Sequence, residues 1–179
     1  MKLACPGNTS GRNRATQLAH TIPLAPEERE KVHRAVKFRG WRDLVNPSGD
    51  REDGPEGGAR HWAKAVEAIR NHNPKTKIEV LIPDFDGDES LLDLVIASKP
   101  DVIGHNIETV ERLTPLVRSR AKYRTSLDVI RYVARSGMTA KSGIMLGLGE
   151  READVLATLD DLAAAGCNLL TIGQYLQPT

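Results

Sequence analysis

Apolar residues along this chain form two patterns, a helical spacing and short continuous runs, which predict helices and strands in regular succession. Trp62, Ala65, Val66 and Ile69 recur every three or four positions, as on one face of a helix. Short apolar runs bounded by proline, glycine or polar residues predict buried strands. The predicted helices cover residues 26–40, 59–71, 90–98, 109–117, 126–135 and 152–165. The predicted strands cover residues 43–46, 77–82, 102–103, 142–146 and 169–175.

This alternation predicts an α/β fold with a parallel sheet and right-handed crossovers. Small and polar residues follow several predicted strands, as in barrels whose site lies at the carboxyl ends of the strands. The 179 residues are too few for a complete eight-fold barrel, which takes about 250. We expect an irregular N-terminal segment over residues 1–22 and a partial barrel domain over residues 23–179.

Composition excludes several partners. The 25 basic and 24 acidic residues nearly cancel, and aromatic residues make up 4%, which argues against nucleic acid. No apolar run approaches the roughly 20 residues that cross a bilayer, and no signal-peptide core precedes the polar N-terminal segment. Two distant cysteines give no disulfide framework. We expect a cytoplasmic protein, or a mitochondrial or plastid one if its source is eukaryotic.

An amide and a carboxylate stand two positions apart after the strand predicted at 102–103. On extended backbone Asn106 and Glu108 would share one side. Such a pair can hold a vicinal diol, as in a ribose. The alternative is that Asn106 or Thr109 caps the next helix.

Further candidate ligands lie at later strand ends. Lys141-Ser142-Gly143 and Gly147-Leu148-Gly149-Glu150 would let the backbone approach a flat or anionic ligand, although a plain turn explains them equally well. Glu150 is as well suited to the first turn of the following helix as to a ligand. Arg124 could clamp a carboxylate or lie on the surface, and Gln174 and Gln177 flank Tyr175 at a possible ligand edge.

Metal chemistry has weaker support in these residues. The acids of residues 50–53 lack regular ligand spacing, and the five histidines form no HxxxH or HExxH pair. Cys167, before an apolar strand, is expected to be a small buried hydrophobe.

Several segments together resemble lipoyl synthase, a family of radical S-adenosylmethionine enzymes. The resemblance runs from about Gly57 to Thr179, roughly two-thirds of the chain, in the family's order and spacing. The segments that carry it are Ile78-Glu79-Val80-Leu81-Ile82-Pro83-Asp84-Phe85, His105-Asn106-Ile107-Glu108-Thr109-Val110, Tyr123-Arg124-Thr125-Ser126-Leu127, Lys141 to Glu150 and Thr171 to Thr179.

The resemblance implies a partial (βα)6 barrel of the radical SAM type that binds S-adenosylmethionine. The family inserts two sulfur atoms into an octanoyl chain on a lipoyl domain or carrier protein, using a 4Fe–4S cluster held by CxxxCxxC and a second cluster as sulfur source. By similarity Asn106 and Glu108 would meet the ribose and Arg124 the methionyl carboxylate. The other implied or candidate cofactor contacts are Ser48, Lys141, Met145, Gly147, Gln174 and Tyr175.

The cysteine motif departs from the family pattern. Cys5 is the only N-terminal cysteine, and three thiolates are needed to hold such a cluster with one iron free. We therefore expect a truncated or frame-damaged copy that is inactive as this chain alone. The alternatives are a cluster-free protein that binds S-adenosylmethionine or a lipoyl domain, and a poorly folding remnant that self-associates through an open barrel edge.

Overall fold

In the computed structural model of this protein, residues 43–47, 58–118 and 120–176 are described. Five parallel strands form one sheet in chain order. They are β1 (Asp43–Pro47), β2 (Lys77–Leu81), β3 (Val102–Gly104), β4 (Thr139–Leu146) and β5 (Leu169–Gln174). Sequential order means that each strand adds to the same edge, which is the arrangement of a barrel sheet rather than of a doubly wound one.

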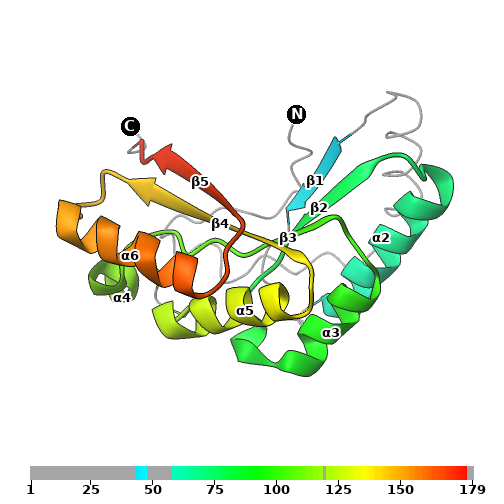
Figure 1. Cartoon of the computed structure of the whole chain (residues 1–179), viewed down its shortest axis with the longest axis horizontal. Coiled ribbons are helices and arrows are strands. Elements are labelled where there is room, and N and C mark those ends of the chain that lie inside the picture. The colour runs from blue at the N-terminus through cyan, green and yellow to red at the C-terminus, as the bar shows by residue number, and fades with distance from the viewer. Residues whose placement is uncertain (1–42, 48–57, 119, 177–179) are drawn as a thin grey trace, which may run out of the picture.

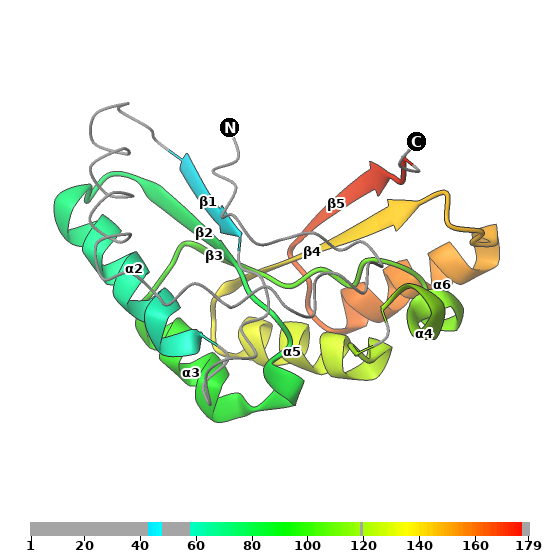
Figure 2. The same cartoon turned by 180° about the vertical axis from the view of Figure 1, so that it is seen from behind.

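The helices cover one face of this sheet. They are α2 (Ala59–His72), α3 (Glu89–Ala97), α4 (Thr114–Val117), α5 (Tyr123–Arg135) and α6 (Glu152–Ala164), with 3-10 turns η2 (Phe85–Gly87) and η3 (Glu111–Leu113). Figure 1 shows α2, α3, α5 and α6 on the same side of the curved sheet, and Figure 2 shows this from behind. Crossovers of one hand produce this layout, which confirms the α/β fold of partial-barrel type.

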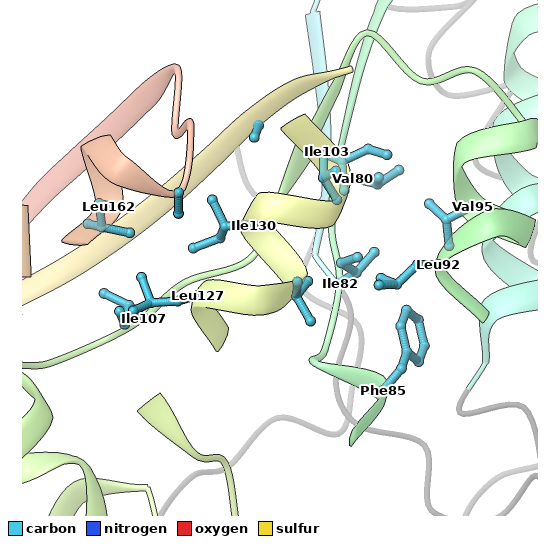
Figure 3. Close-up of a cluster of buried hydrophobic side chains, with 14 of the residues drawn as sticks. Val80, Ile82, Phe85, Leu92, Val95, Ile103, Ile107, Leu127, Ile130 and Leu162 are labelled. Atoms are coloured by element: carbon cyan, nitrogen blue, oxygen red, sulfur yellow. The ribbon is translucent and has the colours of Figure 1, made fainter. Parts of the chain in front are cut away.

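The core lies between the sheet and these helices. Every second residue of the inner strands is buried against them: Ile78, Val80, Ile103, Ala140, Ser142 and Ile144. Figure 3 shows two neighbouring groups, one around Ile130 and Leu162 and the other around Leu92 and Phe85. The intervening residues, such as Glu79 and Lys141, therefore belong to the opposite, concave face.

Three predicted boundaries are wrong. The helix predicted at 126–135 begins three residues earlier, at Tyr123, so Arg124 lies inside it. The helix predicted at 109–117 is a 3-10 turn at Glu111–Leu113 followed by the single turn of α4, and Val110 before them is extended. The strand predicted at 142–146 begins three residues earlier, at Thr139. The helix predicted at 26–40 and the boundary between residues 22 and 23 lie outside the described residues.

At the end of the sheet, β5 is an edge strand among the described residues, because it pairs only with β4. Leu170 and Ile172 on this strand are 36% and 53% exposed. The expected self-association through an open edge stays a prediction. No helix in the described part of the chain is both long and apolar enough to cross a membrane.

Candidate functional site

The carboxyl ends of β3, β4 and β5 meet at one edge of the sheet, where ligands of parallel sheets bind. The backbone that follows β3 runs on beside β4 after β3 itself has ended. The backbone N–H of Glu108 donates to the Gly143 carbonyl, and that of Met145 donates to the Glu108 carbonyl, both at 2.9 Å. Glu108 has a φ of 65°, so the backbone is not extended there. The extended backbone that would place Asn106 and Glu108 on one side is therefore not present, and that prediction is wrong in its assumption.

The capping alternative is also wrong. The residues preceding η3 and α4 are Val110 and Leu113, and neither of these helix starts has a side-chain cap. Asn106 and Thr109 therefore do not cap the next helix. Among the described residues, the Asn106 and Glu108 side chains have no hydrogen-bond partner, and both are half-buried. Their polar groups are free for a ligand.

Gly143 makes room for Asn106. A Cβ atom at position 143 would lie 2.6 Å from the Asn106 Oδ1 and 3.0 Å from its Cγ. The carboxamide of Asn106 therefore rests on the α-carbon of Gly143, closer than any other residue type allows. The sequence pattern suggested that Gly143 lets a ligand approach the backbone. In the structure the space beside Gly143 is instead taken by the side chain of Asn106, a candidate ligand-binding residue.

The turn after β4 is closed by Glu150. Its Oε2 accepts hydrogen bonds from the backbone N–H groups of Gly147 and Leu148, each at 3.0 Å. Burial by itself would raise the pKa of Glu150, but the backbone donors outweigh it and the pKa is lowered. Helix α6 begins at Glu152 with Arg151 as its N-cap. Glu150 is thus not a first-turn charge, and it stabilises the turn of its own loop.

Four candidate residues at the carboxyl ends of β4 and β5 come together at the same edge. Met145 pairs with Gly173 and Leu146 with Gln174 across the two strands. The Tyr175 N–H donates to the Leu146 carbonyl at 2.8 Å. A Cβ at Gly147, whose φ is 107°, would lie 3.7 Å from the Tyr175 carbonyl oxygen. The structure therefore places Met145, Gly147, Gln174 and Tyr175 beside one another, while their contact with a cofactor stays a prediction.

Arg124, at the start of α5, already has a carboxylate partner. Its Nε and Nη2 donate to the two oxygens of Glu111 at 3.0 and 3.1 Å. The side chains of Arg124 and Glu111 are 66% and 53% exposed, and exposed pairs of this kind contribute little to stability. A ligand carboxylate could therefore replace Glu111 at small cost. The predicted role of Arg124 requires this exchange.

Lys141 is paired across the sheet. Its Nζ donates to both carboxylate oxygens of Glu79, at 2.7 and 2.9 Å, and the two side chains are 26% and 19% exposed. The pair connects β4 to β2 across β3 on the concave face. Sequence reasoning included Lys141 and missed Glu79. The sequence did indicate a role for Glu79, because a carboxylate between the buried residues Ile78 and Val80 needs a partner.

We expect this ion pair to show strong coupling. Lys141→Met leaves the Glu79 carboxylate partly buried and unpaired, which should cost about 1–3 kcal/mol of unfolding free energy. Adding Glu79→Gln should restore much of that loss. Urea unfolding of both single variants and the double variant measures the coupling, and additive losses would show that the pair does not act as a unit.

The described residues do not fit an iron–sulfur cluster. They contain no group of three metal-ligating side chains, and Cys167 is their only free cysteine. Cys167 precedes β5, at the end of the sheet opposite the candidate site, and its thiol donates to the Leu169 carbonyl at 3.1 Å. It is half-buried, and burial raises its pKa. Cys5 and Ser48 lie outside the described residues.

The sequence matches known proteins along most of its length. Residues 7–162 match the family model of the radical SAM superfamily. A lipoyl synthase of Phocaeicola vulgatus is 54% identical over 164 residues, which are 92% of this chain and 58% of the relative. A lipoyl synthase of Porphyromonas gingivalis is 49% identical over 93% of this chain and 61% of the relative. The chain thus spans about three-fifths of the length of these relatives, and the similarity extends beyond the two-thirds of the chain predicted from its motifs.

Solved structures agree on the fold. Methylornithine synthase superposes with a TM-score of 0.71 at 15% identity, over 87% of this chain and 45% of that one. Coproporphyrinogen III oxidase from Escherichia coli superposes with a TM-score of 0.62 at 17% identity, over 84% of this chain and 36% of that one. These identities are low, so the structures inform the fold alone. The partial parallel barrel agrees with the family model, whose match over residues 7–162 shows that this chain belongs to the radical SAM superfamily.

Proposed function

We propose that this chain is a lipoyl synthase-related protein that binds S-adenosylmethionine at the carboxyl edge of β3–β5 and does not insert sulfur by itself. The observation that carries the proposal is the pair Asn106 and Glu108, which have no partner among the described residues and sit on a segment hydrogen-bonded to β4. Matches to lipoyl synthases at about 50% identity support the choice of ligand.

The chemistry of the pair suits a ribose. A carboxylate accepts from both hydroxyls of a vicinal diol, and an amide can donate to one oxygen while accepting from the other. Hydrogen bonds to the ionised Glu108 are the stronger ones because they are charge-assisted. Met145, Gly147, Gln174 and Tyr175 would then border the adenine, and Arg124 would take the methionyl carboxylate after releasing Glu111.

Cluster chemistry does not fit the residues of this chain. In a radical SAM reaction the reduced 4Fe–4S cluster supplies the electron that cleaves S-adenosylmethionine. Three thiolates are required, and the 179 residues contain Cys5 and Cys167 only, of which Cys167 lies at the far end of the sheet. We therefore propose binding without turnover for this chain alone.

A second candidate is sulfur insertion on an octanoylated lipoyl domain, with cluster ligands supplied from outside this chain. The extent of identity with lipoyl synthases favours it. It predicts stoichiometric iron and acid-labile sulfide after anaerobic reconstitution, and turnover of an octanoylated peptide. Binding without turnover predicts neither of these results.

The proposed site is tested by calorimetric titration with S-adenosylmethionine. Asn106→Ala and Glu108→Gln should each raise the dissociation constant about tenfold, the usual cost of losing a hydrogen bond to a polar or charged group. Arg70→Lys is a suitable control, because Arg70 pairs with Asp101, which precedes β3 at the end of the sheet opposite the proposed site. Equal affinities for the control and both site variants would overturn the assignment.

A further inference from the structure

A fully buried histidine stands directly before the candidate ribose ligands. His105 is 3% exposed, and its Nδ1 lies 3.0 Å from the Ile82 carbonyl oxygen while its Nε2 lies 2.9 Å from the Ser126 Oγ. A carbonyl oxygen can only accept a hydrogen bond, so Nδ1 carries the ring proton. Nε2 is then a bare acceptor, and the Ser126 hydroxyl must donate to it. In the neutral ring, the Ile82 carbonyl thus determines the direction of both hydrogen bonds of His105.

Arg118 completes the chain of donors. Its Nη1 donates to the Ser126 Oγ at 3.2 Å and to the Asn106 carbonyl oxygen at 3.1 Å. The order is therefore Arg118 to Ser126, Ser126 to His105, and His105 to the carbonyl that follows β2. Each donor of this network has an acceptor, whereas the hydroxyl of the nearby buried Thr109 has no hydrogen-bond partner.

The network anchors the segment that carries the candidate ligands from the side opposite β4. On the β4 side, the Ile107 N–H donates to the Ser142 Oγ at 3.2 Å, and the Glu108 N–H to the Gly143 carbonyl. On the other side, Arg118 contacts the Asn106 carbonyl and His105 is fixed by Ser126. Glu108 has a positive φ, which costs free energy and persists where surrounding contacts hold it.

We infer that His105, Ser126 and Arg118 are positioning residues that set Asn106 and Glu108 in the geometry that recognises the ribose of an adenosyl ligand. The inference rests on the proposed function. None of the three residues needs to touch the ligand, because they act through the backbone on which the two ligand-binding side chains stand. The network requires neutral His105. Burial favours the neutral form by lowering the pKa of His105 to about 4. The charge of Arg118 also lowers this pKa, whereas the charge of Asp84 raises it.

Ser126→Ala is the test variant, because it removes one hydroxyl and leaves the His105 Nε2 and Arg118 without their shared partner. Ser98→Ala is the matched control: Ser98 is also a buried serine, and its hydroxyl donates to the Val95 carbonyl at 2.7 Å, at the C-terminal end of helix α3. Ser126→Ala loses two hydrogen bonds and Ser98→Ala loses one, so both variants lose stability. Only one of them touches the network.

The readout is the preference for S-adenosylhomocysteine over its 2′-deoxy analogue, measured by calorimetry. Wild type and Ser98→Ala should prefer the intact ribose about tenfold, and Ser126→Ala should lose most of this preference. A general loss of stability would weaken both ligands equally. An unchanged preference in Ser126→Ala would overturn the inference.

Amide hydrogen exchange of the ligand-free protein separates this inference from the proposed function. Protection of the Ile107 and Glu108 N–H groups should fall in Ser126→Ala and stay at the wild-type level in Ser98→Ala. Equal protection in the two variants would overturn the positioning role directly. If wild type binds neither adenosyl compound, the proposed function fails, and a fall in protection then still shows that the network orders the segment.

Discussion

Gly143→Ala should weaken binding of S-adenosylmethionine at least about tenfold, with a far smaller effect on folding. The added Cβ would lie 2.6 Å from the Asn106 Oδ1, a separation that real Cβ atoms do not adopt, so the carboxamide must leave its position. Asn106 can swing aside because its side chain is held by no described partner. The protein should therefore fold and lose the geometry of one ribose ligand.

Gly104→Ala is the matched control. Gly104 is paired with Lys141 in the neighbouring strand, and a Cβ there meets the nearest atoms, those of Leu81 and Val80, at an ordinary 3.5 Å. Calorimetric titration should give this variant an affinity close to that of wild type. If Gly143→Ala binds as tightly as Gly104→Ala, Asn106 does not hold the ligand where we place it.

Stability should fall as the pH decreases from about 6.5 towards 4, because His105 titrates differently in the two states. Burial lowers the pKa of His105 from 6.5 to about 4 in the folded protein. The unfolded chain therefore binds a proton that the folded protein resists throughout this window. The contribution is fully present above the unfolded pKa and is lost as the pH approaches the folded one. The shift corresponds to roughly 3 kcal/mol.

His105→Gln isolates this effect. Glutamine cannot take up the proton, so the variant should be less stable than wild type near neutral pH and should lose less stability on acidification. Urea unfolding of both proteins at about pH 7 and about pH 5 gives the difference in slope. The ion pairs of Asp101 and Asp154, whose basic partners are partly exposed, lower the pKa values of those carboxyls, so they titrate below this window. Parallel slopes would show that His105 is not buried in its neutral form.

Apolar spacing was sufficient to predict most of the fold. Strands such as β2 show burial on alternate residues, and α2 keeps the stripe that contains Trp62 and Ile69. The helix predicted from residue 109 failed for a tertiary reason. Glu108 pairs with Ile144 as an extension of the sheet, and Val110 stays extended and fully buried. The local sequence of residues 109–117 could not reveal that the chain is still attached to β4.

The site was predictable as a set of residue types and not as an arrangement. Asn106 and Glu108 stood out because polar residues followed a short apolar run. The contact of Asn106 with Gly143, and the pairing of Glu79 with Lys141, depend on strand register between segments more than thirty residues apart. Arg118, Ser126 and His105 likewise come from three different segments. Contacts between segments so far apart cannot be predicted from a local sequence pattern.

The most direct test of the account is calorimetric titration of S-adenosylmethionine into the purified chain after anaerobic reconstitution, with iron and sulfide measured on the same sample. We predict a saturable isotherm with one site per chain in a protein that contains no stoichiometric iron. Two results would contradict this. About four irons per chain, with turnover of an octanoylated peptide, would show that the chain assembles a cluster after all. An iron-free protein without measurable binding at about 1 mM ligand would show that the barrel edge does not hold the cofactor.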